Sequence, residues 1–315
     1  MSESSQTLRL GTRGSHLAKT QSRMIAAELE KKHNGLTVEL IIIKTTGDQV
    51  QDRPLHEIGG KGLFTKELEL ALLAGEVDLA VHSFKDVPVT EPLVDQADLV
   101  VAAVPKREDP RDVLCSRVAT TIANLPQAAK VGTGSLRRRA QLLSLRPDLV
   151  VEDLRGNIDT RLRKLRDGQY DAIVLAAAGL RRGGLFNEGE MTLLEPAEML
   201  SAPGQGALAV QCHRNNVRAR ELISALDDPE TERCITTERM IVAALNGDCK
   251  SPIAALARIH NGEMSLQVAV GAEDGHPPVI RAQASAPLDR AHTAVDAIMR
   301  DLSQQNVQAL LHGSR

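Results

Sequence analysis

The sequence predicts two α/β domains followed by a smaller α+β domain, and three observations lead to this prediction. Strand and helix patterns alternate through the first hundred residues, which is typical of a largely parallel sheet with helices on its faces. The same alternation starts again after residues 106–110 and runs to a turn-rich segment at 201–206. From about residue 228 the order changes to a helix, then strands, then a terminal helix.

In the first domain the pattern predicts a short strand at 8–10 and a helix at 15–32. A near-continuous apolar run at 38–44 predicts a strand buried on both faces, as in parallel sheets. A helix at 64–74 and strands at 78–81 and 99–104 complete this domain.

In the second domain we expect strands at 130–133, 149–151 and 171–175, with helices beginning near 135 and covering 158–167. A further strand at 207–211 fits either α/β domain. In the third domain Asp228-Pro229 is a helix start and Asn246-Gly247 a helix end. Strands at 253–259, 265–270 and 278–284 and a helix at 288–304 follow.

Composition narrows the function classes. The 315 residues are 42% hydrophobic and 25% charged, as in a soluble globular protein. Aromatic residues make up only 1%, which disfavours base-stacking contacts with nucleic acid, and the net charge of −3 gives no polyanion signal. No run approaches the 18 apolar residues of a membrane span, and the N-terminus is polar. We therefore expect a cytoplasmic protein with no membrane and no nucleic-acid partner.

Neither a metal site nor a disulfide framework is indicated. The four cysteines form no C-x-x-C pair, and no two of the nine histidines have metal-ligand spacing. Cys249 lies in a loop just past the predicted helix end. From its position alone it is either a small core hydrophobe or a reachable thiol, and most lone cysteines are the former.

Arginine is concentrated in the second domain. Ten arginines lie between residues 137 and 182: Arg137, Arg138, Arg139, Arg146, Arg155, Arg161, Arg163, Arg166, Arg181 and Arg182. We interpret Arg139, Arg163 and Arg166 as solvated helix-surface charges. Arg137-Arg138 and Arg155, however, follow two successive strands, at the edge of a sheet where ligands bind. Because guanidinium groups bind carboxylates bidentately, this edge predicts a cleft for a small, multiply anionic ligand.

Two motifs in the first domain point to the same kind of site. HSFKDVP at 82–88 follows a strand and places Lys85 and Asp86 at a ligand edge. His82 and Ser83 are poor partners for a catalytic triad, because adjacent side chains on a strand face opposite ways. GTRGS at 11–15 is either an anion-binding turn or an ordinary turn in which Ser15 caps a helix. GGKGLF at 59–64 is a loop with one lysine, since it lacks the spacing of a phosphate-binding loop.

Together these motifs resemble the porphobilinogen deaminase family, also called hydroxymethylbilane synthase. The matching segments are GTRGS at 11–15, GGKGLF at 59–64, VHSFKDVP at 81–88, REDPRD at 107–112, GTGSLRR at 132–138, LRGN at 154–157, GQGA at 204–207, ER at 238–239 and CKSPI at 249–253. The similarity runs from about residue 7 to the C-terminus, in the order that the family has.

The resemblance implies a transferase that joins four porphobilinogen molecules head to tail and releases ammonia and hydroxymethylbilane, a precursor of haem. It also implies a dipyrromethane cofactor, built from substrate and held by a thioether at Cys249. Six rings would carry roughly twelve carboxylates, two per ring, which accounts for the many arginines. A carboxylate at Asp86 can hold the pyrrole N–H groups and stabilise positive charge, so the resemblance makes Asp86 catalytic.

The other site residues are carried over by the same resemblance. Besides Cys249 and Asp86, those for the cofactor are Ser83, Lys85, Thr133, Ser135, Arg137, Arg138, Arg155 and Gly156. Those for the substrate are Arg13, Ser15, Arg155, Arg161 and Arg182. Lys61 and Phe64 belong to a loop that covers the site in the family, and no metal is implied.

The resemblance also implies two periplasmic-binding-protein-like (type II) α/β domains and a monomer. Domain 1 would comprise 1–104 and 204–224, domain 2 would comprise 105–203, and domain 3 would comprise 225–315. The chain departs from the family pattern at Asp248, Ser251 and Gly134. Two other classes stay open: a solute-binding protein of the same two-lobed architecture, and an arginine-rich RNA-binding protein.

Overall fold

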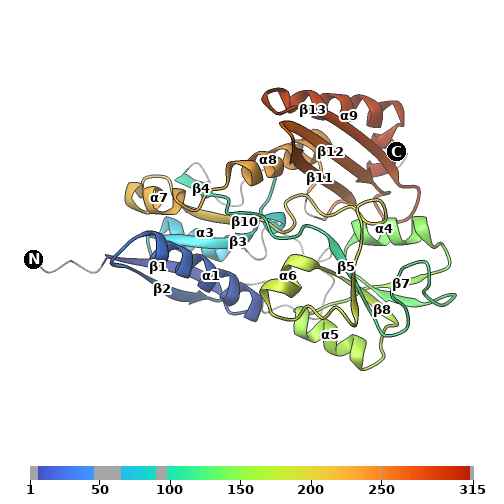
Figure 1. The fold of residues 1–315 in the computed structure, drawn as a ribbon, viewed down its shortest axis with the longest axis horizontal. Helices are drawn as coiled ribbons and strands as arrows, with labels where there is room; N and C mark the ends of the chain where they lie inside the picture. Colours follow the sequence, from blue (N-terminus) through green and yellow to red (C-terminus); the bar gives the residue numbers. More distant parts are fainter. Residues whose placement is uncertain (1–5, 46–64, 90–97, 249, 313–315) are drawn as a thin grey trace, which may run out of the picture. The chain divides into compact units, whose positions relative to one another are not determined.

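The computed structural model describes residues 6–45, 65–89, 98–248 and 250–312. The chain forms two compact units. The first comprises Met1–Glu108 and Ala207–Glu232, and the second comprises Asp109–Gly206 and Arg233–Arg315. Figure 1 shows the elements of each unit along the coloured chain.

The first unit is built on a mixed sheet in the order β2-β1-β3-β10-β4. Its strands are β1 (Gln6–Arg13), β2 (Leu36–Ile43), β3 (Leu79–Ser83), β4 (Leu99–Ala103) and β10 (Leu208–His213). Strand β1 is parallel to β2 and β3, whereas β10 is antiparallel to β3 and β4. The strand expected at 207–211, which the pattern left open, therefore lies in the first sheet.

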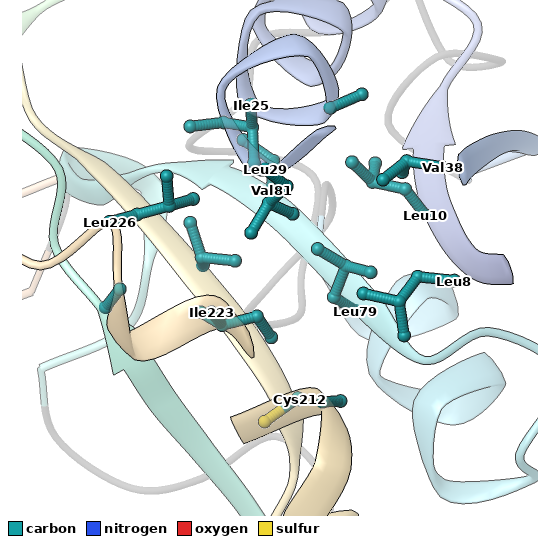
Figure 2. Close-up of a cluster of buried hydrophobic side chains, with 14 of the residues drawn as sticks. Leu8, Leu10, Ile25, Leu29, Val38, Leu79, Val81, Cys212, Ile223 and Leu226 are labelled. Carbon is teal, nitrogen blue, oxygen red and sulfur yellow. The ribbon is translucent and has the colours of Figure 1, made fainter. Parts of the chain in front are cut away.

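Helices α1 (His16–Lys32), α3 (Lys66–Leu73) and α7 (Val217–Ser224) accompany this sheet, and a 3-10 turn, η1 (Phe84–Asp86), follows β3. One core cluster joins α1 and α7 to the sheet (Figure 2). It contains Leu8 and Leu10 from β1, Ile25 and Leu29 from α1, and Ile223 from α7. Apart from Cys212, the side chains of this cluster are aliphatic, in keeping with the 1% aromatic content of the sequence.

The second unit contains a second mixed sheet, in the order β7-β6-β8-β5-β9. Its strands are β5 (Asp112–Ser116), β6 (Lys130–Gly132), β7 (Val150–Glu152), β8 (Ala172–Ala176) and β9 (Met191–Leu193). Helices α4 (Leu136–Leu145), α5 (Ile158–Arg166) and α6 (Ala177–Arg182) connect or follow them. Strands β6, β7 and β8 are parallel, as predicted, and β5 pairs antiparallel with both β8 and β9.

The C-terminal elements form a smaller α+β domain. Helix α8 (Pro229–Ala244) precedes an antiparallel meander of β11 (Ile253–His260), β12 (Glu263–Val270) and β13 (Ile280–Pro287). A 3-10 turn, η3 (Leu288–Arg290), leads to α9 (His292–Gln304), which packs on β12 and β13, and α10 (Val307–His312) follows. The predicted fold class is confirmed at the level of the sheets: two mixed α/β sheets with helices and a smaller antiparallel α+β domain.

Helix starts are set by side chains that the sequence shows. Ser15, Ser135, Asn157 and Asn216 each occupy an N-cap position and accept a hydrogen bond from a backbone N–H of the first turn. Asp228 likewise accepts from the N–H of Thr231 at 2.8 Å, directly before Pro229. These caps fix where each helix begins, and four of these five helices follow a strand, so the strand-to-helix turns are defined as well.

Candidate functional site

Predicted site residues of the first unit lie at the ends of two neighbouring strands. Arg13 is the last residue of β1, Ser83 is the last of β3, and Lys85 and Asp86 lie in the η1 turn that follows. Buried Phe84 anchors that turn, because its N–H donates to Ala207 O at 3.0 Å. Parallel strands β1 and β3 end at the same sheet edge, so the structure brings these residues to one edge.

Two serines at this edge already have local hydrogen bonds. The Ser15 hydroxyl accepts from the N–H of Ala18 at 3.3 Å, which makes it the cap of α1. The Ser83 hydroxyl accepts from Gln21 Nε2 at 3.4 Å. Both therefore help to shape the turn.

His82 is buried and neutral rather than catalytic. Its Nε2 lies 3.0 Å from Gln211 Oε1 on the neighbouring strand β10. Burial lowers the pKa of His82 to about 4, although the Gln211 contact opposes the shift and Arg13 adds to it. The side chain is buried, whereas Ser83 beside it is half-buried, so a triad reading of this motif has no support.

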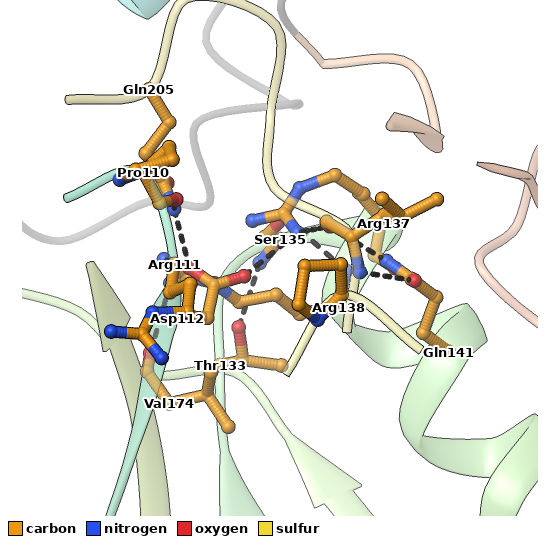
Figure 3. A network of polar contacts seen from close by, with 12 residues as sticks. Pro110, Arg111, Asp112, Thr133, Ser135, Arg137, Arg138, Gln141, Val174 and Gln205 are labelled. Atoms are coloured by element: carbon orange, nitrogen blue, oxygen red, sulfur yellow. Dashed lines mark hydrogen bonds and ion pairs between the residues drawn. The ribbon is translucent and has the colours of Figure 1, made fainter. Parts of the chain in front are cut away.

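In the second unit the paired arginines converge on a buried aspartate (Figure 3). Arg137 Nη1 donates to Asp112 Oδ2 at 2.8 Å, and Arg138 Nη2 donates to Asp112 Oδ1 at 2.7 Å. The arginines are only 4% and 6% exposed, and Asp112 is 0% exposed. The sequence predicts arginines presented to a ligand at this turn, and the structure shows in addition that Asp112 binds both of them within the protein.

Asp112 itself was missed as a functional residue. The only signal was its place in the REDPRD segment, and nothing in the local pattern pairs it with residues 25 positions away. Gln205 also binds it, because Gln205 Nε2 donates to Asp112 Oδ1 at 2.8 Å. Gln205 Nε2 lies 2.7 Å from Pro110 O as well.

Thr133 and Ser135 form the turn that carries this arginine pair. The N–H of Ser135 donates to Thr133 Oγ1 at 3.3 Å, and Ser135 Oγ accepts from the N–H of Arg138 as the N-cap of α4. Their hydroxyls thus orient the first turn of the helix, where Arg137 and Arg138 lie.

The turn after β7 carries Arg155, Gly156 and, one helical turn later, Arg161. Gly156 has φ +108°, and a Cβ there would lie 2.6 Å from a carbon of the Thr160 side chain, so only glycine fits. Arg161 Nε donates to Gly156 O at 2.7 Å. The Nε of Arg155 is buried and has no hydrogen-bond partner among the described residues.

The arginines read as surface charges differ in exposure. Arg163 and Arg166 are exposed on α5, as expected of surface charges. Arg139 is only partly exposed and its Nε is buried, so its assignment as a solvated charge stays a prediction. Arg182 Nη2 donates to Gly206 O at 2.8 Å, which ties it to the segment that ends the second α/β domain.

Cys249 lies outside the described residues, and so do Lys61 and Phe64. The residues on either side of Cys249 form a defined turn. Asn246 has φ +54°, and the N–H of Gly247 donates to Val242 O at 2.9 Å, so helix α8 ends as the sequence predicts. The Asp248 carboxylate then accepts from the N–H of Lys250, the N–H of Ser251 and the Ser251 hydroxyl, each at 2.9 Å.

Cys115, Cys212 and Cys234 are buried. Burial raises the pKa of Cys115 to about 12 and that of Cys212 to about 11. Because the thiolate is the nucleophile, these two are poor candidates for covalent attachment of a ligand.

The described part of the chain contains no cluster of three or more His, Cys, Asp or Glu side chains that could hold a metal ion. In the same residues, no helix is both long and apolar enough to cross a membrane.

Comparisons with known proteins place these features in a family. Residues 8–221 match the family model "Porphobilinogen deaminase, dipyromethane cofactor binding domain", and residues 232–303 match "Porphobilinogen deaminase, C-terminal domain". The chain is 47% identical to the porphobilinogen deaminase of Roseiflexus castenholzii over 98% of this chain and 99% of that protein.

Two further relatives bear the same name. The chain is 47% identical to the enzyme of Syntrophobacter fumaroxidans over 90% of each chain. It is 49% identical to that of Stenotrophomonas maltophilia over 90% of this chain and 91% of the other. With both family models in order along one chain, this protein belongs to the porphobilinogen deaminase family.

Proposed function

We propose that the protein joins four porphobilinogen molecules head to tail, with loss of ammonia, and releases hydroxymethylbilane for haem and other tetrapyrroles. The observation that carries this proposal is the family match, which covers both α/β domains and the C-terminal domain at 47% identity to a full-length relative. The reaction class is that of a transferase.

The residues of the second unit fit a dipyrromethane cofactor, which has one acetate and one propionate on each ring. The Nε atoms of Arg137, Arg138 and Arg155 are buried without a hydrogen-bond partner among the described residues. Buried guanidinium donors are expected to be paired, and carboxylates are their best-matched acceptors. Arg137, Arg138, Arg155 and Gly156, with Thr133 and Ser135 shaping the turn, would hold the cofactor there.

When bound, the cofactor supplies a terminal pyrrole to which the first substrate is joined. We assign its attachment to the thiol of Cys249. The location of the other cysteines supports this choice, because all three are buried within the described residues. The turn formed by Asp248, Lys250 and Ser251 supports it as well, because it lies past the end of α8 rather than in a core.

In the first unit we assign catalysis to Asp86. Its half-buried carboxylate lies at a strand end, where it can accept hydrogen bonds from pyrrole N–H groups and stabilise the positive charge that develops as ammonia leaves. Lys85 and Ser83 would assist in cofactor binding. Substrate carboxylates would be bound by Arg13, Ser15, Arg155, Arg161 and Arg182, and the loop with Lys61 and Phe64 would cover the site.

The domain boundaries are 1–104 with 204–224, 105–203, and 225–315. We expect the protein to act in the cytoplasm and as a monomer. No nucleic acid is required, and the shortage of aromatic residues supports that view.

A turnover assay tests the proposal. The purified protein is incubated with porphobilinogen, and substrate consumption, ammonia and hydroxymethylbilane are followed together. We expect about four ammonia molecules for each hydroxymethylbilane, because each condensation releases one amine. Absence of substrate consumption by folded protein purified from cells that make porphobilinogen would refute the assigned activity.

A further inference from the structure

The carboxylate of Asp112 is the centre of a buried ionic cluster in the second unit. Three side chains donate to it: Arg137 at 2.8 Å, Arg138 at 2.7 Å and Gln205 at 2.8 Å. Burial alone would raise the pKa of this carboxyl, but the two guanidinium groups hold it far below its usual range. Asp112 is therefore charged at every physiological pH.

The other contacts of the two guanidinium groups are neutral. Arg137 Nη1 also donates to Leu200 O, and Arg138 Nη1 donates to Val174 O at 2.9 Å. A carbonyl contributes a dipole but no net charge. Among the described residues, two buried cations thus share one buried anion, and one positive charge is in excess.

This excess charge is unfavourable at Arg137. Burial lowers the pKa of Arg137, Asp112 opposes that shift, and repulsion from Arg138 adds to it. The Nε atoms of both arginines remain buried without a hydrogen-bond partner among the described residues. A buried charge that is incompletely paired strongly destabilises a fold, so the cluster is favourable only when a further anion completes it.

We infer that Asp112 is a positioning residue, which holds both guanidinium groups in place through its two carboxylate oxygens. The pair then keeps one net positive charge, which a single ligand carboxylate neutralises. The identity of this ligand as a carboxylated pyrrole rests on the proposed function, whereas the charge count rests on the cluster itself. Gln205 helps to hold the Asp112 carboxylate in place, because it donates a hydrogen bond to that carboxylate without adding charge.

This arrangement predicts opposite effects for two substitutions. A ligand that binds only the folded state stabilises it, so the chain with cofactor should melt above the cofactor-free Cys249→Ser chain. Arg138→Met removes the excess charge and should narrow this difference in Tm. Asp112→Asn keeps the side-chain shape but doubles the excess charge, so it should lower Tm most in the cofactor-free chain and widen the difference.

Arg146→Met is the matched control. Arg146 also pairs with an aspartate, Asp148 at 2.8 Å, and donates to the backbone carbonyls of residues 122, 123 and 125. It lies in the same unit but at the C-terminal end of α4. Its loss should lower both Tm values equally and leave the difference unchanged. Arg138→Lys, which keeps the charge, should restore part of the difference lost in Arg138→Met.

The experiment measures Tm for each variant with and without Cys249→Ser, and cofactor loading by denaturing mass spectrometry. We expect Arg138→Met to slow loading about tenfold or more, the usual worth of a hydrogen bond to a charged group. If Arg138→Met and Arg138→Lys shift both Tm values equally, as Arg146→Met does, the inference is wrong. These two variants decide the question even if Asp112→Asn does not fold.

A second measurement separates this inference from the proposed function. The Cys249→Ser chain is melted in propionate and in chloride at equal ionic strength. Propionate should raise Tm in this chain and with Arg146→Met added, but not with Arg138→Met added. A wild-type chain without a pyrrole adduct would refute the proposed function alone, whereas equal response of all three chains to propionate would refute the charge inference.

Discussion

Asp86 occupies a short turn whose geometry is set by its neighbours. Phe84 is buried beneath the turn, and the N–H of Val87 donates to Phe84 O at 3.1 Å, so the backbone at Asp86 does not depend on its own side chain. Replacing the carboxylate should therefore leave the fold intact and remove only its chemistry.

We predict that Asp86→Asn lowers kcat by about 10²–10⁴-fold, the usual contribution of a positioned acid–base or electrostatic group. Asp98→Asn, which changes an exposed carboxylate of the same unit, is the control and should be near wild type. Steady-state consumption of porphobilinogen measures both, and circular dichroism checks folding. Wild-type turnover by folded Asp86→Asn protein would show that another group is catalytic.

His82 makes the stability of the first unit depend on pH. Its pKa is about 4 in the folded protein, lowered by burial, against an ordinary value of 6.5. The unfolded chain thus binds a proton that the folded chain excludes, so stability is fully present above pH 6.5 and is lost as pH falls toward 4. The loss is on the order of 3 kcal/mol for a shift of this size.

We predict that His82→Gln flattens the dependence of unfolding free energy on pH between 6.5 and 4, because glutamine does not titrate. Urea denaturation at half-unit pH steps measures this slope. His260→Gln, at the exposed end of β11, should keep the wild-type slope. Parallel pH curves for wild type and His82→Gln would mean that folding does not change the pKa of His82.

Among the elements, the turn after α8 combines two residues that depart from the family pattern. Asp248 and Ser251 form a reciprocal pair: the N–H of Asp248 donates to Ser251 Oγ, and Ser251 donates through both its N–H and its hydroxyl to Asp248 Oδ1, each at 2.9 Å. The two departures are thus structurally coupled, and together they fix the backbone on both sides of residue 249 in the chain.

We predict that Asp248→Ala and Ser251→Ala each slow cofactor loading of Cys249, and that the double variant is no slower than the worse single one. The expected coupling is about 1 kcal/mol, since both changes break the same hydrogen bonds. Asp248→Asn keeps the acceptor oxygen and should load at close to the wild-type rate. Mass spectrometry over time measures loading; strictly additive effects would show that the pair does not act as a unit.

The turn after β7 and helix α5 allow a comparison of two arginines from one segment. Arg155 has a buried Nε without a partner among the described residues, whereas Arg163 is exposed in the last turn of α5. Arg155→Leu should impair loading or elongation of the pyrrole chain, and Arg163→Leu should be nearly neutral. Equal effects of the two changes in loading and turnover would contradict the assignment of Arg155 to ligand binding.

For the whole molecule, sequence patterns predicted those helix starts that local hydrogen bonds determine. The helix starts predicted at 15 and near 135 lie within one residue of the observed starts, where the structure shows Ser15 and Ser135 as N-caps. Strands β5 and β9 were missed, because β5 is buried at every position and β9 has only three residues, so neither shows the alternation that marks a strand. Helix α7 was not predicted either.

Some residues of the candidate site could likewise be placed from the sequence, whereas others could not. Strand-end positions such as Asp86 and Arg155 could be predicted because a strand-to-helix pattern shows where a strand ends. The pairing of Asp112 with Arg137 could not, because this ion pair joins β5 to α4 across 25 positions of the chain. Asp248 and Ser251 are visible as unusual residues, but only the structure shows that they bind each other.

Denaturing mass spectrometry with peptide mapping tests most directly whether Cys249 alone carries a dipyrromethane. The wild-type chain, purified from cells that make porphobilinogen, should show a two-pyrrole mass increment on the peptide with Cys249. Cys249→Ser should lack it, show no turnover and melt earlier, because a ligand held by the folded state is lost. Cys115→Ser, Cys212→Ser and Cys234→Ser should each keep the increment. An unmodified wild-type chain, or an increment on any other cysteine, would contradict the account.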